Sequence, residues 1–156
     1  MSSLGIHHHK IFVSDTQQSI EFYRDLLGFE VVYEAERSNL SSYDKIMGMD
    51  SIHVRVTMLW LGSEESTIAL VQFLHPPMDT QWQPWIIKAG LSTLAISVQD
   101  IDADFDRLCA AGVRSVSEPV DIIRDGHRTS RTCYIFDPDG LPIELYEAFA
   151  TLEETK

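Results

Sequence analysis

Hydrophobic and polar positions follow nearly the same order twice along this chain. An alternating stretch that ends at Val13 leads, after Asp15, into apolar residues with helical spacing that stop at Gly28. A second alternating stretch leads, after Asp100, into another such run, which stops at Gly112. Further β-rich stretches follow each copy. A pattern that occurs only twice predicts two related halves of one structure rather than a longer array of repeats.

The first copy predicts one helix and four strands. Asp15 followed by Gln18 is typical of a capping box at a helix start, and Gly28 is typical of a helix end. The polar stretch 39–51 has little periodicity and predicts a loop that holds at most a helical turn. Residues 62–66 predict the turn of a hairpin. The predicted strands cover residues 6–13, 29–33, 52–61 and 67–74.

The second copy predicts the same order of elements. A helix is expected over residues 101–111, and Asp137-Pro138-Asp139-Gly140 is typical of a tight turn between strands. The predicted strands cover residues 92–98, 113–115, 120–124, 132–136 and 141–146. The pattern therefore predicts a single α+β domain of two βαβββ modules, with module one over about 5–75, a connector over 76–90 and module two over about 91–149. The connector contains Trp82 and Trp85, for which both a lid and a loop anchor are open roles.

Charge and hydropathy narrow the classes of partner. The net charge is -12, so the basic surface that dominates nucleic-acid affinity is missing. No apolar run approaches the roughly 18–20 residues that cross a bilayer, and no secretory signal is visible at the N-terminus. We therefore expect a cytoplasmic protein whose partner is a small organic molecule, with neither nucleic acid nor membrane involved.

Several motifs together resemble one family. They are "VSD" at residues 13–15, "SIEFYRDLLGFEVV" at 19–32, "SVQDIDADFDRLCAAGV" at 97–113 and "FDPDGLPIELYE" at 136–147. This set resembles the vicinal oxygen chelate superfamily, which includes glyoxalase I, methylmalonyl-CoA epimerase, extradiol dioxygenases and the bleomycin-resistance proteins. The resemblance implies two curled sheets that face each other around a cup, with the helices outside, and commonly a homodimer. It does not fix the reaction, because the chemistries of the family differ.

The resemblance also implies where a divalent metal would bind. Enzymes of the family place four ligands in the cup, and here His8 and Glu144 match two of those positions. Thr93 and Ala69 stand at the other two, where a hydroxyl is a poor ligand and a methyl group cannot coordinate at all. Gln72, His75 and His127 are the candidates for replacement ligands. No cofactor is therefore assigned with certainty, and a divalent metal held by His8 and Glu144 is the minor alternative.

His8, Glu144 and Arg55 are the candidate catalytic residues. His8 and Glu144 are expected to line the cup, where an imidazole and a carboxylate can act as a general acid/base pair or position a ligand. Arg55 would bind a substrate carboxylate or enolate oxygen through its two-pronged guanidinium. The structural alternative is that all three are polar residues on exposed strands. The predicted substrate-binding residues on the same faces are Lys10, Phe12, His53, Phe73, Thr93 and Tyr146.

Three functions follow from this set. The leading one is a glyoxalase-like enzyme, a lyase or isomerase, that transfers a proton next to a carbonyl or acid group and has an incomplete metal site. The alternative is a protein that sequesters a small ligand without chemistry, as the bleomycin-resistance proteins do. The third is a metal-dependent lyase or dioxygenase whose ligands have been rebuilt.

Overall fold

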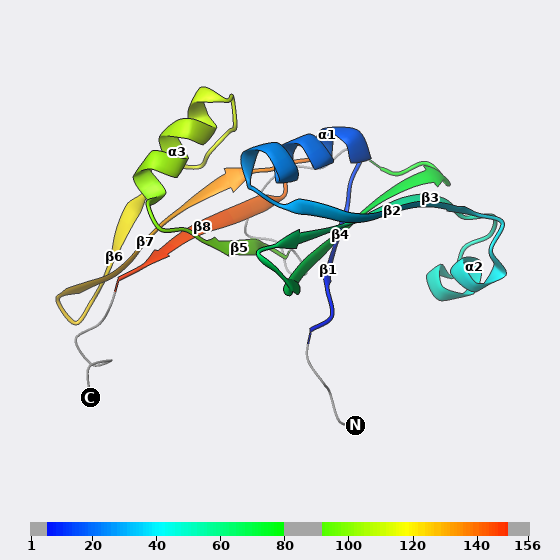
Figure 1. Ribbon diagram of the computed structural model, residues 1–156, viewed down its shortest axis with the longest axis horizontal. Coiled ribbons are helices and arrows are strands. Elements are labelled where there is room, and N and C mark those ends of the chain that lie inside the picture. The colour runs from blue at the N-terminus through cyan, green and yellow to red at the C-terminus, as the bar shows by residue number, and fades with distance from the viewer. Residues whose placement is uncertain (1–5, 80–91, 150–156) are drawn as a thin grey trace, which may run out of the picture. The chain divides into compact units, whose positions relative to one another are not determined.

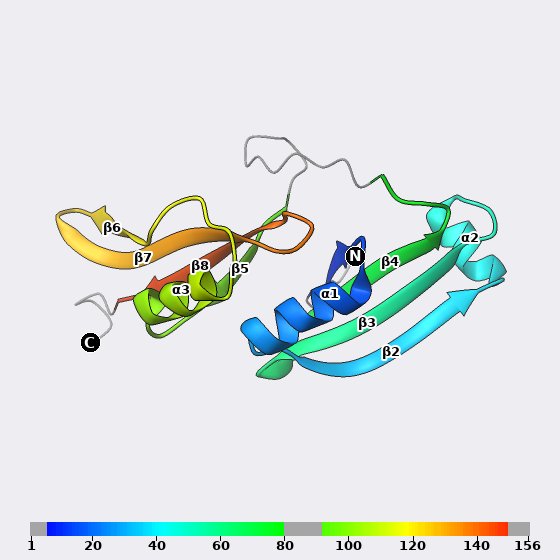
Figure 2. The same cartoon turned by 90° about the horizontal axis from the view of Figure 1, so that it is seen from above.

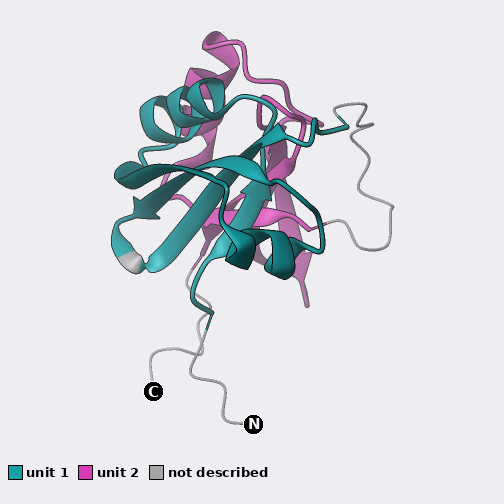
Figure 3. Cartoon of the chain, turned by 90° about the vertical axis from the view of Figure 1, so that its right-hand side faces the viewer, with its two compact units in different colours: residues 1–82 teal, residues 83–156 magenta. Residues whose placement is uncertain are grey.

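The chain divides into two compact units in a computed structural model that describes residues 6–79 and 92–149. Unit 1 covers Met1–Trp82 and unit 2 covers Gln83–Lys156 (Figure 3). Trp82 and Trp85 lie outside the described residues, as does most of the expected connector. The module boundaries therefore stay a prediction, and each unit is considered by itself.

Unit 1 is built on a four-stranded mixed sheet in the order β1-β4-β3-β2. Strand β1 runs parallel to β4, whereas β3 is antiparallel to both β4 and β2. The elements are β1 (His9–Phe12), α1 (Thr16–Ile20) with its π-helical continuation η1 (Glu21–Leu26), β2 (Glu30–Ser38), α2 (Ser41–Met47), β3 (His53–Leu61) and β4 (Ser63–His75) (Figure 1).

The helix of unit 1 begins and ends where the sequence predicted. The carboxylate of Asp15 accepts a hydrogen bond from the Gln18 amide at 3.0 Å, which satisfies one of the free donors of the first turn. The chain leaves the helix at Gly28, whose φ of 78° is a conformation that glycine adopts without a steric penalty.

Helix α1 covers one face of the sheet of unit 1, which we call the α1 face (Figure 1 and Figure 2). Gln72 marks this face, because its side chain hydrogen-bonds to Thr16 in the first turn of α1. Alternation along β4 puts Leu70 and Ile68 on the same side, and the strand register adds Ile11 from β1. These three apolar side chains are almost fully buried, so the α1 face holds much of the core of the unit.

The opposite face carries α2, which corrects the loop predicted over residues 39–51. Tyr43 and Met47 of α2 pack against a buried cluster of Ile52, Val54 and Val71. The carboxylate of Asp44 accepts a hydrogen bond from the backbone N–H of Ile52 at 2.9 Å. A seven-residue helix has too little periodicity to be read from sequence, and tertiary packing supplies its stability. We call this side of the sheet the α2 face.

Unit 2 repeats the topology with a four-stranded sheet in the order β5-β8-β7-β6. Helix α3 lies on one face of this sheet (Figure 1), and its N-cap Asp100 accepts from the amide of Ala103 at 3.1 Å. The strand expected over 113–115 forms only an isolated bridge between Ser115 and Ile135. The elements are β5 (Leu94–Ser97), α3 (Ile101–Ala110), β6 (Val120–Arg124), β7 (His127–Phe136) and β8 (Pro142–Ala148).

The predicted fold class is confirmed. The chain is an α+β protein of two βαβββ-type modules, each with a four-stranded mixed sheet and β1 or β5 parallel to the strand that ends its module. Neither described stretch, 6–79 or 92–149, contains a helix that is long and apolar enough to span a membrane.

Candidate functional site

The strand registers show which residues of the two modules correspond. Lys10 on β1 stands opposite Ala69 on β4, and Ala95 on β5 stands opposite Glu144 on β8. His8 and Thr93 come two residues before the first member of each pair. The register therefore supports the sequence alignment of His8 with Thr93 and of Ala69 with Glu144.

These four residues do not fit the four-ligand metal site of the family. Unit 1 offers the imidazole of His8 beside the methyl group of Ala69, and unit 2 offers the carboxylate of Glu144 beside the hydroxyl of Thr93. Borderline metals such as zinc bind Cys, His and carboxylate side chains far better than a neutral hydroxyl. Within residues 6–79 and 92–149, no three His, Cys, Asp or Glu side chains gather closely enough to hold a metal ion.

His8 lies directly before β1, with its ring against a second imidazole. The Nδ1 atoms of His7 and His8 are 2.8 Å apart, and the two rings meet edge to face. Partial burial lowers the pKa of His8, and the neighbouring His7 and Lys10 lower it further. His8 is thus held toward its neutral form.

Glu144 lies at the centre of the face of unit 2 that is turned away from α3, which we call the open face. The residues of this face, by register, are Ala95, Ser97, Thr132, Tyr134, Glu144 and Tyr146. Thr93, Ala95 and Ser97 are exposed, so small side chains border the carboxylate on the β5 side. The predicted substrate-binding residues Thr93 and Tyr146 both belong to unit 2, and Tyr146 stands on the same face as Glu144.

Two hydroxyl groups from β7 hold the Glu144 carboxylate. The hydroxyl of Thr132 lies 2.9 Å from Oε1 of Glu144, and the phenol of Tyr134, the direct cross-strand partner, also bonds to it. Burial raises the pKa of Tyr134, and the charge and the hydrogen bond of Glu144 raise it further. The phenol therefore stays protonated and able to donate to the carboxylate. Neither Thr132 nor Tyr134 was singled out from the sequence.

On the α2 face of unit 1, the structure brings together three of the predicted substrate-binding residues. Phe12 and Phe73 lie with their ring centroids 5.9 Å apart, and Lys10 shares the face with both. Ala69, Val71 and Val56 continue this surface toward β3. The result is an apolar sheet face with one ammonium group.

A cavity of about 530 Å³ lies at the other end of the α2 face. Trp60, Met58 and Tyr33 give it an aromatic and apolar wall, and Glu65 adds a carboxylate. The full lining is Ile6, His7, Val32, Tyr33, Met58, Trp60, Glu65 and Thr67. The sequence analysis missed this cavity because it placed the odd-numbered residues of β3 on this side, whereas Met58 and Trp60 are even-numbered.

The same register corrects the expected positions of Arg55 and His53. Arg55 pairs with Gln72, and Val54 pairs with Phe73, so Arg55 lies on the α1 face and not beside Phe73. The sequence analysis assigned the polar residues of β3 to the side of the ligand. Helix α1 covers only part of its own face, however, so charged side chains have room on that face as well. Gln72, one of the candidate replacement ligands, points away from the face of Ala69.

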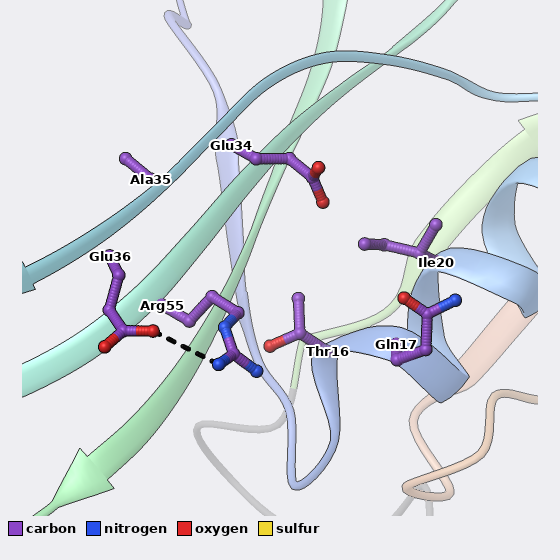
Figure 4. A pocket seen from close by; sticks show the side chains of 7 residues that line it. All are labelled: Thr16, Gln17, Ile20, Glu34, Ala35, Glu36 and Arg55. Carbon is purple, nitrogen blue, oxygen red and sulfur yellow. Dashed lines mark hydrogen bonds and ion pairs between the residues drawn. The ribbon is translucent and has the colours of Figure 1, made fainter.

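Arg55 and His53 share one carboxylate on the α1 face. Nε2 of His53 lies 2.6 Å from Oε1 of Glu36, and Nη2 of Arg55 lies 3.1 Å from Oε2 of the same residue. The hydrogen bonds from His53 and then Arg55 lower the pKa of Glu36. Beside this group is a second pocket, of about 370 Å³ (Figure 4). Its lining is Thr16, Gln17, Ile20, Glu34, Ala35, Glu36 and Arg55.

Comparison with known proteins agrees with the fold and the registers. The chain is 34% identical to the uncharacterized protein YwkD of Bacillus subtilis, with 92% of this chain and 96% of YwkD aligned. It is 27% identical to a probable lactoylglutathione lyase of Synechocystis, with 90% and 92% aligned. A crystal structure of a glyoxalase family protein from Bacillus cereus superposes with a TM-score of 0.83 at 26% identity and covers 96% of this chain and 97% of that one. Residues 5–145 match the Glyoxalase/Bleomycin resistance protein/Dioxygenase superfamily. The chain therefore belongs to this superfamily, the one that its sequence motifs resemble.

Proposed function

We propose that this protein is an enzyme that transfers a proton next to a carbonyl or acid group of a small organic molecule, with Glu144 as the base. One observation carries the proposal. The Glu144 carboxylate is held by the hydroxyls of Thr132 and Tyr134 on a sheet face where its neighbours on β5 are small.

The chemistry needs only the side chains of this face. Glu144 removes a proton from the carbon next to the carbonyl group. The electron pair of the C–H bond forms a C=C bond to the carbonyl carbon, and the π pair of the carbonyl bond moves onto its oxygen to give an enolate. The carboxylic acid then returns the proton to the same carbon or to a neighbouring one. Thr132 and Tyr134 fix the direction of the carboxylate, so that less of its freedom has to be lost when the substrate binds.

Three other candidate residues lie in unit 1. Arg55 is left out of the proposed reaction, because it lies on the α1 face. We keep His8 as a candidate partner in acid/base catalysis and Lys10 as a candidate ligand for a substrate anion.

The relatives suggest where to look for a substrate. The Synechocystis relative carries the name of a probable lactoylglutathione lyase, so lactoylglutathione belongs in a first panel. The panel is completed with α-hydroxyketones and 2-oxo acids, since a carboxylate base acts on the acidic C–H bonds of such compounds.

Hydrogen exchange tests the proposal without knowledge of the natural product. The full-length protein is incubated in D₂O with each compound, and proton NMR follows the loss of the signal at the carbon next to the carbonyl group. We expect at least one compound to exchange with the wild type and not with Glu144→Gln. Exchange at equal rates in both proteins would contradict the role of Glu144.

The second candidate function is sequestration of an aromatic ligand. It is favoured by the cavity of about 530 Å³ on the α2 face, where an indole, a phenol and a thioether line the wall beside the Glu65 carboxylate. A planar organic cation of the acridine class is a suitable probe. It should quench tryptophan fluorescence in a saturable way, and Trp60→Phe should remove most of that response.

Assembly, location and metal content complete the proposal. We propose a cytoplasmic homodimer, and light scattering after gel filtration measures its mass. Elemental analysis of protein purified without a tag tests the third function, a metal-dependent lyase or dioxygenase with rebuilt ligands, which requires about one metal ion per chain.

A further inference from the structure

We infer that unit 1 carries a second binding site, on its α1 face, for a small zwitterion of the size of a free amino acid. The site is the pocket of about 370 Å³ between α1 and strands β2 and β3. It lies on the opposite side of the sheet of unit 1 from Lys10, Phe12 and Phe73, so within this unit it is separate from the α2 face.

The pocket holds one carboxylate that is open to a ligand. Glu34 lies on β2 directly opposite Thr57, and its side chain extends toward Ile20 of α1 (Figure 4). Among the described residues, none donates a hydrogen bond to the Glu34 carboxylate. Arg24 of η1 already interacts with Glu34 through its charge, and an ammonium group of a ligand would add the hydrogen bonds that the carboxylate lacks.

The pocket also holds a guanidinium with donors to spare. Arg55 uses Nη2 for its bond to Glu36, and within residues 6–79 and 92–149 its remaining N–H groups have no partner. Figure 4 shows this guanidinium between Glu36 and Thr16, facing the same space as Glu34. A planar fork of this kind is suited to a carboxylate.

The opposite charges of Glu34 and Arg55 together determine which ligand the pocket selects. An anion without an ammonium group would bind Arg55 but face the repulsion of Glu34 and Glu36. A cation without a carboxylate would pair with Glu34 and be repelled by Arg55. A zwitterion satisfies both side chains at once, and Ile20 and Ala35 provide apolar contacts for its side chain.

Titration of the full-length protein with free amino acids tests the inference. Each of the twenty common L-amino acids is added, and binding is followed by proton–nitrogen NMR shifts of residues 16–36 and 53–57. For any that bind, the matched analogues without the ammonium or without the carboxylate are compared; for leucine these are 4-methylpentanoate and 3-methylbutylamine. We expect at least one amino acid to saturate with a dissociation constant of about 1 mM or lower, and both of its analogues to bind at least fivefold more weakly.

Matched variants locate the site. Glu34→Gln and Arg55→Gln should each weaken binding at least fivefold, whereas Glu30→Gln on the same strand and Arg107→Gln on α3 should leave it unchanged. Glu144→Gln should also leave it unchanged, so failure of this site and failure of the proposed reaction are distinguishable. The inference is overturned if no amino acid saturates, if an analogue binds as tightly as its parent, or if binding survives both pocket substitutions.

Discussion

The hydroxyl of Thr132 lies 2.9 Å from a carboxylate oxygen of Glu144, across neighbouring strands of unit 2. The same hydroxyl is also 2.9 Å from the backbone carbonyl oxygen of Leu145, so its single proton is shared between two acceptors on β8. Thr132 therefore has a fixed position from which it can orient the base. It acts through Glu144 and is a positioning residue.

Removal of this hydroxyl should slow the proposed reaction without unfolding the protein. A hydrogen bond to a charged group is worth about 1.5–3 kcal/mol, so Thr132→Val should lower the rate of deuterium exchange about tenfold or more. Thr129→Val is the matched control, because Thr129 also lies on β7 but its hydroxyl donates to the carbonyl of Ile122 on β6 and not to Glu144. Equal rates in the Thr132 and Thr129 variants would show that Thr132 does not position the base.

Removal of the Thr57 hydroxyl should make the folded protein more stable. Its buried hydroxyl has no partner among the described residues, so replacement by the isosteric Val should raise the free energy of unfolding by about 1 kcal/mol. The hydroxyl of Thr16 is the reference, because Thr16 is buried and its hydroxyl donates to Oε1 of Gln72 at 2.7 Å, so Thr16→Val should lower the free energy of unfolding. Urea denaturation measures these changes. A loss of stability in Thr57→Val comparable to that in Thr16→Val would mean that the Thr57 hydroxyl is bonded.

Gln72 fastens the start of α1 to the sheet. Its Oε1 accepts from the backbone N–H of Thr16 at 3.2 Å and from the hydroxyl at 2.7 Å, and its Nε2 donates to the carbonyl of Ser14 at 2.8 Å. With about 1 kcal/mol for each bond, Gln72→Ala should lower the free energy of unfolding by about 2–3 kcal/mol. Gln17→Ala removes one exposed bond to Glu21 and should change it by less than about 0.5 kcal/mol. Similar values for the two variants would contradict the fastening role.

The contribution of Glu36 to the free energy of unfolding should depend on pH. Because hydrogen bonds from His53 and Arg55 lower its pKa below the usual value of 4.5, the ionised carboxylate stabilises the folded state. That contribution to stability is complete above pH 4.5, and it is lost as the pH falls through the lowered pKa of Glu36 in the folded state. The difference in unfolding free energy between wild type and Glu36→Gln should therefore be larger at pH 7 than at pH 3. A difference that is the same at both values would contradict this assignment.

Much of the fold could be predicted because its signals are local. Asp15 and Gly28 mark the ends of the first helix through capping and positive φ, and Asp137 to Gly140 mark a turn, without any knowledge of distant contacts. Helix α2 was missed because Tyr43 and Met47 are ordered by packing on Val54 and Val71, which lie far along the chain.

The candidate site could be predicted only where the strand register was simple. Lys10, Phe12 and Phe73 were placed on one face correctly, because β1 and the middle of β4 alternate without interruption. Arg55 was placed on the wrong face, because the sequence does not show how β3 is aligned with β4. Polarity suggested a ligand site at the odd positions, whereas those positions face α1.

The hydroxyl partners of Glu144 could not be found in the sequence at all. Thr132 and Tyr134 are polar residues on a strand and carry no motif. Only the antiparallel register of β7 and β8 puts them beside the carboxylate.

The central claim is tested most directly by the rate of deuterium incorporation in Glu144→Gln, measured with the compound that exchanges fastest in the wild type. Glu147→Gln on the same strand serves as the control. The account predicts that exchange falls to the uncatalysed rate in Glu144→Gln and stays at the wild-type rate in Glu147→Gln. Wild-type exchange in Glu144→Gln, in protein that is fully folded by circular dichroism, would contradict it.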